Sequence, residues 1–284
     1  MANPGLRKVS IKENNSPYKW HIIRWSFVLL INFFFFASFY FDIQLLEGTL
    51  SGSRLFGFHL ADPFAAIQTM FASKVFNTNL IIGAVTIGVF YLLFGGRSFC
   101  SWVCPFHFIA EMNDYLKKYL KNKNILQFKQ HTFDRKLKYI IFFLFIALAT
   151  LSGLTIFEII NPVSALSRAF VYGPGVVLIF VIGLLVFELL FSRRGWCRFF
   201  CPVGVSYILL GFISPLKIHW NNEKCSNCKD CQKVCMVPHV LTESVNKGKT
   251  TFVVSGECTR CGLCIDACDD GALKYKTKYL DKLI

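Results

Sequence analysis

The sequence predicts an all-α transmembrane four-helix bundle, made of two parallel repeats and followed by a small C-terminal α+β domain. The first observation is composition: of 284 residues, 54% are hydrophobic and 17% are charged, whereas soluble domains carry about 25% charged residues. The second is that eight of the 12 cysteines lie after residue 224. We therefore expect an N-terminal segment over 1–21, a membrane domain over 22–212 and a cysteine-rich domain over 213–284.

Four apolar stretches mark the expected helices. They are Ile22–Phe41, Asn79–Phe94, Tyr139–Ile159 and Gly175–Phe191. The hydrocarbon core of a bilayer requires about 20 apolar residues per helix, with a lower limit near 17. The second and fourth stretches are short and must borrow flanking residues to span it.

Basic residues predict the orientation. The first 25 residues hold five Lys or Arg and segment 96–138 holds nine, but segment 42–78 holds only two. Because cytoplasmic loops collect Lys and Arg, we expect a multi-pass membrane protein with both termini and the cysteine-rich domain in the cytoplasm. The same rule accounts for the net charge of +14 and makes a nucleic-acid partner unnecessary.

An internal repeat relates the two halves of the predicted membrane domain. "VFYLLFGGRSFCSWVCP" (89–105) aligns with "VFELLFSRRGWCRFFCP" (186–202), 97 residues later. Further upstream, Asp62 and Asn161 each precede a proline, which is typical of a helix N-cap followed by the first helical residue. Each half is then predicted to contain a helix that leaves the cytoplasmic side, a short helix on the other side, a helix that returns, and a Cys-x3-Cys-Pro motif. Because both halves run in the same direction, they are parallel repeats.

The C-terminal cysteines form two Cys-x2-Cys-x2-Cys-x3-Cys runs. In two-cluster bacterial ferredoxins the fourth cysteine of each run serves the other [4Fe–4S] cluster. The predicted ligands are Cys225, Cys228, Cys231 and Cys268 for cluster 1, and Cys258, Cys261, Cys264 and Cys235 for cluster 2. Zinc is the alternative, but a zinc ribbon needs only two Cys-x2-Cys pairs. Both runs lack the usual proline after the last cysteine, which weakens the match slightly.

The two Cys-x3-Cys-Pro motifs contain the other four cysteines. Thiols at i and i+4 of a helix share a face, so the repeats can place Cys100, Cys104, Cys197 and Cys201 together at the cytoplasmic end of the bundle. They could be packing residues; a disulfide is disfavoured in the reducing cytosol. The third interpretation is a redox site, either a thiolate-bound metal or cluster or a pair of cycling dithiols. We favour it because Arg97 and Arg194, three residues before each first cysteine, stabilise thiolates.

Acidic residues in the apolar region are candidates for proton handling. Glu188 lies in the fourth apolar stretch, where an ionisable residue indicates function unless it reaches water at the membrane surface. Glu158 and Asp62 lie near the opposite face, where Asp62 also fits a simple cap. The six histidines form no matched pair on facing stretches, so b-type haem is not expected. Segments 104–123 and 203–216 are expected to lie along the membrane surface.

The combination of paired Cys-x3-Cys-Pro motifs with an eight-cysteine C-terminal domain resembles the NapH/MauN family of ferredoxin-type membrane proteins. The resemblance implies a subunit that takes electrons from the membrane quinol pool. It also implies a periplasmic polyferredoxin or multihaem cytochrome, of a nitrate reductase system, as the partner. Related membrane modules leave two alternatives: a factor that reduces a metal during assembly of a respiratory enzyme, and a membrane redox sensor.

Overall fold

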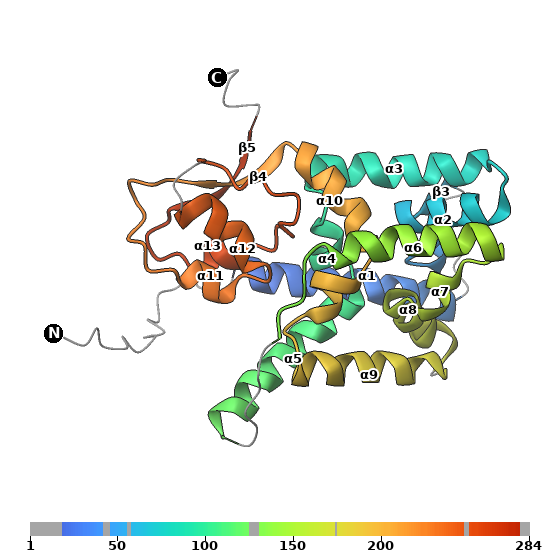
Figure 1. Cartoon of the computed structure of the whole chain (residues 1–284), viewed down its shortest axis with the longest axis horizontal. Helices are drawn as coiled ribbons and strands as arrows, with labels where there is room; N and C mark the ends of the chain where they lie inside the picture. Colours follow the sequence, from blue (N-terminus) through green and yellow to red (C-terminus); the bar gives the residue numbers. More distant parts are fainter. Residues whose placement is uncertain are drawn as a thin grey trace.

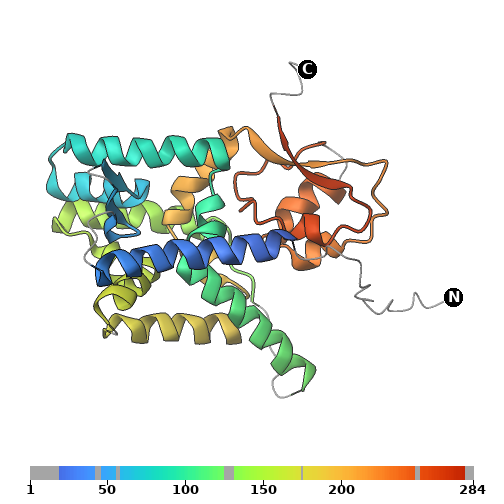
Figure 2. The same cartoon turned by 180° about the vertical axis from the view of Figure 1, so that it is seen from behind.

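The computed structural model describes residues 19–41, 46–55, 58–124, 131–173, 175–246 and 250–278. The residues up to about 213 form a long, mostly helical body, and the cysteine-rich domain sits at one end of it (Figures 1 and 2). Each part has its own apolar core. The chain ends at 1–18 and 279–284 lie outside the described residues, and so do most of the predicted N-terminal segment and the predicted location of both termini.

The predicted bundle of four transmembrane helices is wrong. Across the described ranges, only α1 (Lys19–Tyr40, 22 residues) is long and apolar enough to cross a membrane. The other apolar helices are α3 (Thr78–Phe94), α6 (Leu137–Ser152) and α9 (Val177–Leu190), with 17, 16 and 14 residues. At 1.5 Å per residue α9 is about 21 Å long, against a hydrocarbon core of about 30 Å.

Local backbone geometry explains why a long apolar stretch does not become one long helix. Helix α6 stops at Gly153, whose φ of 68° lies in the left-handed region that glycine adopts without a steric penalty. The apolar residues that follow it, which were expected to continue the helix to Ile159, instead form the separate short helix α7 (Ile156–Ile160). Hydropathy alone does not detect this break, because the residues on both sides of it are apolar.

Short helices, rather than the four apolar ones, fill the centre of the body. Helix α2 (Pro63–Ser73) packs against α3 and α6, and α8 (Pro162–Tyr172) packs against α1 and α9. Helix α10 (Val203–Ile213) contacts α2, α3 and α6. Tyr207 and Ile208 of α10 are only 1% and 0% exposed. One face of α10 therefore belongs to the core, while Leu209, Phe212 and Ile213 are exposed. That this segment lies along the membrane surface stays a prediction.

The two predicted N-caps are confirmed. Asp62 Oδ2 accepts from the backbone N–H groups of the second and third residues of α2, both at 3.1 Å. Asn161 Oδ1 accepts from Val163 N of α8 at 3.1 Å. In both helices proline is the first residue, where its missing N–H is no loss. The repeat thus preserves the same local chemistry in both halves.

A small antiparallel sheet occupies the far end of the body and was not predicted. Its strands are β1 (Leu46–Thr49), β2 (Gly52–Leu55) and β3 (Phe58–Ala61), in the order β1-β2-β3. Strand β3 lies against α3, where a Cβ atom at Gly83 would come within 2.5 Å of the His59 carbonyl oxygen. The absence of a side chain at Gly83 therefore allows this close contact.

The cysteine-rich domain does not have the clear α+β architecture that was predicted. Its one described sheet has two antiparallel strands, β4 (Leu216–Trp220) and β5 (Leu273–Thr277). Its helical pieces are α11 (Asp230–Val234), α12 (Pro238–Leu241), the π-helix η2 (Thr242–Asn246) and α13 (Leu263–Asp266). None of them exceeds five residues, because the chain must turn repeatedly to bring separate cysteines together.

Helix α1 is anchored to the cysteine-rich domain at its first turn. The backbone N–H groups of Trp20 and His21 donate to the Asp266 carboxylate at 3.3 and 3.0 Å. Asp266, which is far away in sequence, therefore acts as the cap of α1. One turn further along, Arg24 pairs with Glu111 of α5 (Pro105–Asn122) at 2.6 Å, and both side chains are buried. The Asp266 contacts join the two parts of the molecule, and the Arg24–Glu111 pair holds α1 against α5 within the body.

Replacing Asp266 with alanine is expected to destabilise the chain by about 1 kcal/mol, because the first N–H groups of α1 lose their acceptor. The measurement is thermal unfolding of the full chain in detergent, followed by circular dichroism. Asp269→Ala, at an exposed aspartate nearby, is the matched control and should leave the transition unchanged. Equal effects of the two substitutions would contradict a capping role for Asp266.

Candidate functional site

The eight cysteines of the C-terminal domain line two separate cavities. The first, the proximal cavity, is lined by Cys235, Cys258, Cys261 and Cys264; the second, the distal cavity, by Cys225, Cys228, Cys231 and Cys268. Each cavity takes three cysteines from one run and the fourth from the other. This grouping has the arrangement that the predicted ligand sets require. That the thiols hold clusters stays a prediction.

Matching backbone turns shape both cysteine runs. Asn227 and Lys229 flank the second cysteine of the first run, and Arg260 and Gly262 flank that of the second run. All four have positive φ, at 56°, 63°, 48° and 78°. Left-handed residues of this kind fold successive backbone N–H groups toward one point and form concave anion sites. Both loops are therefore shaped to surround a negatively charged group, such as a sulfide-rich cluster.

The protonation chemistry of these thiols fits a bound iron–sulfur cluster. Burial raises the pKa of Cys261 and Cys264, and it raises the pKa of Cys231 to about 11. Such thiols stay protonated at neutral pH unless a metal displaces the proton. Within the described ranges, no three His, Cys, Asp or Glu side chains are spaced to hold a single ion. A cubic cluster accepts one thiolate at each of four irons, so its ligands stand further apart.

The Cys-x3-Cys-Pro motifs have the same backbone course in both repeats. Helix α4 (Ser98–Trp102) precedes Cys104, and the π-helix η1 (Trp196–Phe200) precedes Cys201. Cys104 N donates to the carbonyl five residues back at 3.1 Å, and so does Cys201 N at 2.9 Å. Both cysteines are extended, with φ near −70° and ψ near 115°, because the following proline disfavours helix. The expected regular helical turn is thus widened by one residue.

The second cysteine of each motif lies at the start of the next helix. The backbone N–H groups of Phe106 and His107 donate to the Cys104 sulfur, and that of Gly204 donates to the Cys201 sulfur. The positive end of a helix stabilises a thiolate. Burial nevertheless dominates, raising the pKa of Cys104 and raising that of Cys201 to about 12. A cation is therefore needed before these thiols ionise.

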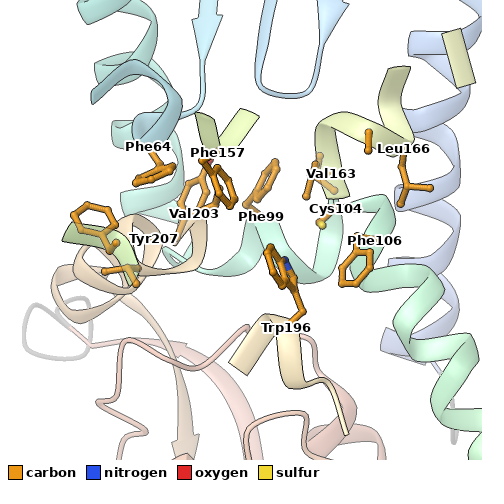
Figure 3. Packing of buried hydrophobic residues seen from close by; sticks show 14 of the residues in the cluster. Phe64, Phe99, Cys104, Phe106, Phe157, Val163, Leu166, Trp196, Val203 and Tyr207 are labelled. Atoms are coloured by element: carbon orange, nitrogen blue, oxygen red, sulfur yellow. The ribbon is translucent and has the colours of Figure 1, made fainter. Parts of the chain in front are cut away.

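The four motif cysteines meet in one apolar core. Cys104 is buried in it, and Cys100, Cys197 and Cys201 pack against it. Figure 3 shows Cys104 within this core, together with Trp196 from the second repeat. Cys104 interacts electrostatically with Cys100 and Cys201, and Cys197 interacts with Cys104 and Cys201. The structure therefore places thiols from both halves of the chain within interaction range.

Both predicted arginines are buried beside these cysteines. Arg97 donates to the Cys197 carbonyl oxygen at 2.9 Å and also bonds the Cys100 side chain, so it contacts both motifs. Arg194 is held by Asp114 at 2.8 Å and by Nε2 of His107 at 2.8 Å. His107 Nε2 also lies 2.8 Å from the sulfur of Met236. Met236 directly follows Cys235, which lines the proximal cavity.

Helix α4 is bonded directly to the loop that carries two proximal-cavity cysteines. Ser101 Oγ donates to the Thr259 carbonyl oxygen at 2.7 Å, and Trp102 Nε1 donates to the Arg260 carbonyl oxygen at 3.0 Å. These acceptors lie between Cys258 and Cys261, while Cys100 lies in α4 itself. The motif cysteines and the proximal cavity are therefore neighbours through a shared wall, and the distal cavity is further out.

The structure separates the three acidic candidates. Glu188 is buried, and its Oε1 accepts from Trp196 N at 3.1 Å, next to Cys197. Glu158 accepts from Ser164 Oγ at 2.6 Å and from Asn161 Nδ2 at 3.3 Å, within the cap of α8. Burial raises the pKa of Asp62 to about 7. These positions connect Glu188 to the thiol site and give Glu158 a structural role.

Buried Tyr207 was missed by sequence reasoning. Its ring stacks on Phe99 with centroids 5.0 Å apart, and it interacts with Asp62. No local pattern distinguishes this tyrosine from the apolar residues around it. Its contacts with Phe99 and Asp62 depend on α10 packing against both α2 and α3.

Two family models match the chain. One, described as a 4Fe-4S binding domain, matches residues 76–123 and again residues 174–221. These two matches contain the two Cys-x3-Cys-Pro motifs. The other, a 4Fe-4S dicluster domain, matches residues 224–273. Both cysteine-rich regions thus resemble iron–sulfur domains.

Whole-chain comparisons give relatives of similar length. Ferredoxin-type protein NapH of Haemophilus influenzae is 33% identical over 86% of this chain and 85% of that protein. NapH of Escherichia coli is 32% identical over 92% and 91%, respectively. The methylamine utilization ferredoxin-type protein MauN of Methylorubrum extorquens is 32% identical over 88% and 86%. No solved structure matches the chain.

Proposed function

The chain belongs to the NapH/MauN family of ferredoxin-type electron-transfer proteins, and on this premise we propose that it takes electrons from quinol. The electrons pass through [4Fe–4S] clusters toward a periplasmic reductase. By resemblance to NapH, the partner is a polyferredoxin or multihaem cytochrome of a nitrate reductase system. The observation that carries the proposal is that α4, which holds Cys100, is bonded to the loop that lines the proximal cavity, with the distal cavity in the same domain.

We assign cluster ligands from the cavity walls. Cys258, Cys261, Cys264 and Cys235 hold one [4Fe–4S] cluster in the proximal cavity, and Cys225, Cys228, Cys231 and Cys268 hold the other in the distal cavity. The crossed fourth cysteine ties the two runs together, so binding of the clusters also stabilises the domain over 213–284. That domain is the electron-carrying unit, and the body over 22–212 is the membrane-facing one.

The four motif cysteines act as one redox site beside the proximal cavity. Two features support this role: thiols from both repeats meet there, and the matched 4Fe-4S binding domain model covers each motif. Dithiol cycling requires an accessible thiolate, whereas burial raises the pKa of Cys104 and Cys201. This chemistry favours a bound iron–sulfur cluster over a cycling dithiol.

Contact with the membrane follows from the outer surface of the body. Large apolar side chains are exposed along the apolar helices, including Phe33 of α1, Phe90 of α3, Phe143 of α6 and Ile179 of α9. Exposed apolar side chains in this number mark a protein or membrane interaction surface, and we propose that the membrane covers them. Basic segment 96–138 begins at the cluster end, so we propose that the clusters face the cytoplasm. Quinol, which is soluble in the membrane, can reach this surface.

Electron transfer from quinol must balance. Oxidation of one quinol to quinone releases two electrons and two protons. The clusters of the proximal and distal cavities accept one electron each, and the protons leave to water. Buried Glu188, beside Cys197, is the residue placed best to relay a proton away from the thiol site.

The proposal predicts that quinol reduces the clusters in the intact protein. The full chain, purified without oxygen and reconstituted in lipid nanodiscs, should show the paramagnetic signal of reduced [4Fe–4S] clusters after addition of menadiol. Dithionite provides the reference for complete reduction. Clusters that dithionite reduces fully but menadiol leaves oxidised, in the presence or absence of a soluble acceptor, would exclude quinol oxidation.

A further inference from the structure

A large aromatic cavity lies where the helical body meets the cysteine-rich domain. Its volume is about 370 Å³, larger than that of either cluster cavity. Its walls come from α1, α3, α4, β4 and β5, which meet at the end of the body nearest the cysteine-rich domain (Figures 1 and 2). Its aromatic lining includes Trp20, Phe27, Phe90, Trp102 and Tyr275. We call it the aromatic cavity.

Among the polar groups that line the aromatic cavity, the Ser98 hydroxyl is available for a ligand. Ser98 is 7% exposed, and its Oγ has no hydrogen-bond partner among the described residues. In contrast, Tyr275 OH and Trp102 Nε1 both donate to the Arg260 carbonyl oxygen, at 2.6 and 3.0 Å. A buried hydroxyl without a partner costs free energy, so Ser98 is poised to bind an oxygen atom of a ligand.

The charge balance of the aromatic cavity favours a neutral ligand. The Arg260 guanidinium already donates to the carbonyl oxygens of Leu216, Cys258 and Gly211, at 3.2, 2.8 and 2.9 Å. Its N–H donors are therefore occupied by backbone oxygens, and none of the described residues that line the cavity is acidic. A charged ligand would find neither a free guanidinium donor nor a carboxylate there. Aromatic walls instead favour a flat ring. The fitting ligand is therefore an uncharged ring that carries oxygen.

The aromatic cavity lies between the redox sites and opens toward the apolar surface. Arg260 lines both it and the proximal cavity, and Ser98 lies two residues before Cys100 in α4. At its rim, Phe27, Phe90 and Phe94 are 43%, 50% and 54% exposed. An apolar tail can leave the cavity along these side chains while the ring stays next to the thiols.

We propose that the aromatic cavity is the quinol-binding site, with a quinol oxygen bonded to Ser98 Oγ and the apolar tail passing between α1 and α3. The inference rests on the proposed function and names the place where its substrate binds. Ser98 acts as a binding residue.

The test uses the full chain with its clusters, in lipid nanodiscs, and menadiol as the reductant. Ser98→Ala should raise the menadiol concentration for half-maximal cluster reduction about tenfold, the effect of losing one buried hydrogen bond. Ser206→Ala is the matched control, because its Oγ is also buried without a described partner but does not line the cavity. Leu216→Trp, which fills the cavity, should abolish reduction by menadiol, and dithionite should still reduce the clusters of all three variants.

A binding measurement separates this inference from the proposed function. A photoreactive azidoquinone should label peptides of α1, α3 or α4 in the unsubstituted chain, and Leu216→Trp should prevent the labelling. Labelling of the cavity without reduction by menadiol would overturn the proposed function and leave the binding site standing. Reduction by menadiol that is unchanged in both Ser98→Ala and Leu216→Trp, or labelling confined to other helices, would overturn the binding site.

Discussion

Replacing Cys100 and Cys104 by serine is expected to abolish menadiol-dependent reduction of the clusters. Adding Cys197→Ser and Cys201→Ser should lower the reduction rate little further. We expect the first pair of substitutions to lower the rate by at least about 100-fold. The two pairs lie in one core and interact electrostatically across the repeat. Residues that act as a unit show strongly non-additive effects, so removing either pair disables the whole site.

Stopped-flow measurement of cluster bleaching gives these rates for the unsubstituted chain, for each double variant (Cys100→Ser with Cys104→Ser, and Cys197→Ser with Cys201→Ser) and for the quadruple variant. Full reduction by dithionite serves as the control, because the eight C-terminal thiols are untouched in every variant. Iron content should fall only by the share that a cluster at the motif site contributes. If the motif cysteines only pack, serine at each costs some stability, the costs add, and the quadruple variant reduces its clusters at the original rate. That result would leave the motifs as helix terminators.

Cys235→Ala should remove one cluster. Although Cys235 belongs to the first cysteine run, the lost cluster is the one that the first three cysteines of the second run hold in the proximal cavity. The chain then loses about four irons. The double variant Cys235→Ala with Cys261→Ala should lose no more, because both residues line the proximal cavity. Cys235→Ala with Cys228→Ala should lose about eight, because Cys228 lines the distal cavity.

These two double variants are matched, since each removes two thiols and differs only in the cavity affected. Iron and sulfide are measured on full-length protein purified without oxygen, relative to the unsubstituted chain. If each run held its own cluster in sequence order, the losses would be reversed: about eight for the pair that includes Cys261 and about four for the pair that includes Cys228. The iron counts therefore decide between crossed and sequential ligation.

Local chemistry explains what could be predicted from the sequence. The spacing of the eight C-terminal cysteines predicts the two crossed groups that line the cavities. The caps at Asp62 and Asn161 follow from side chains that bond N–H groups two or three residues away. The extended backbone at Cys104 and Cys201 follows from the proline next to each. All these features depend on neighbours in sequence, or on a motif whose members share one ligand.

The sequence by itself determined the family, the cysteine groups, the repeat and its caps. Only the tertiary structure decided that the four apolar stretches do not form a four-helix transmembrane bundle, that one face of α10 belongs to the core, and that Asp266 caps α1. It alone brings Ser98, Arg260 and Tyr275 around one cavity. Apolar periodicity reports that a segment avoids water, but it cannot tell a lipid neighbour from a protein one. That choice depends on contacts between residues far apart in the chain.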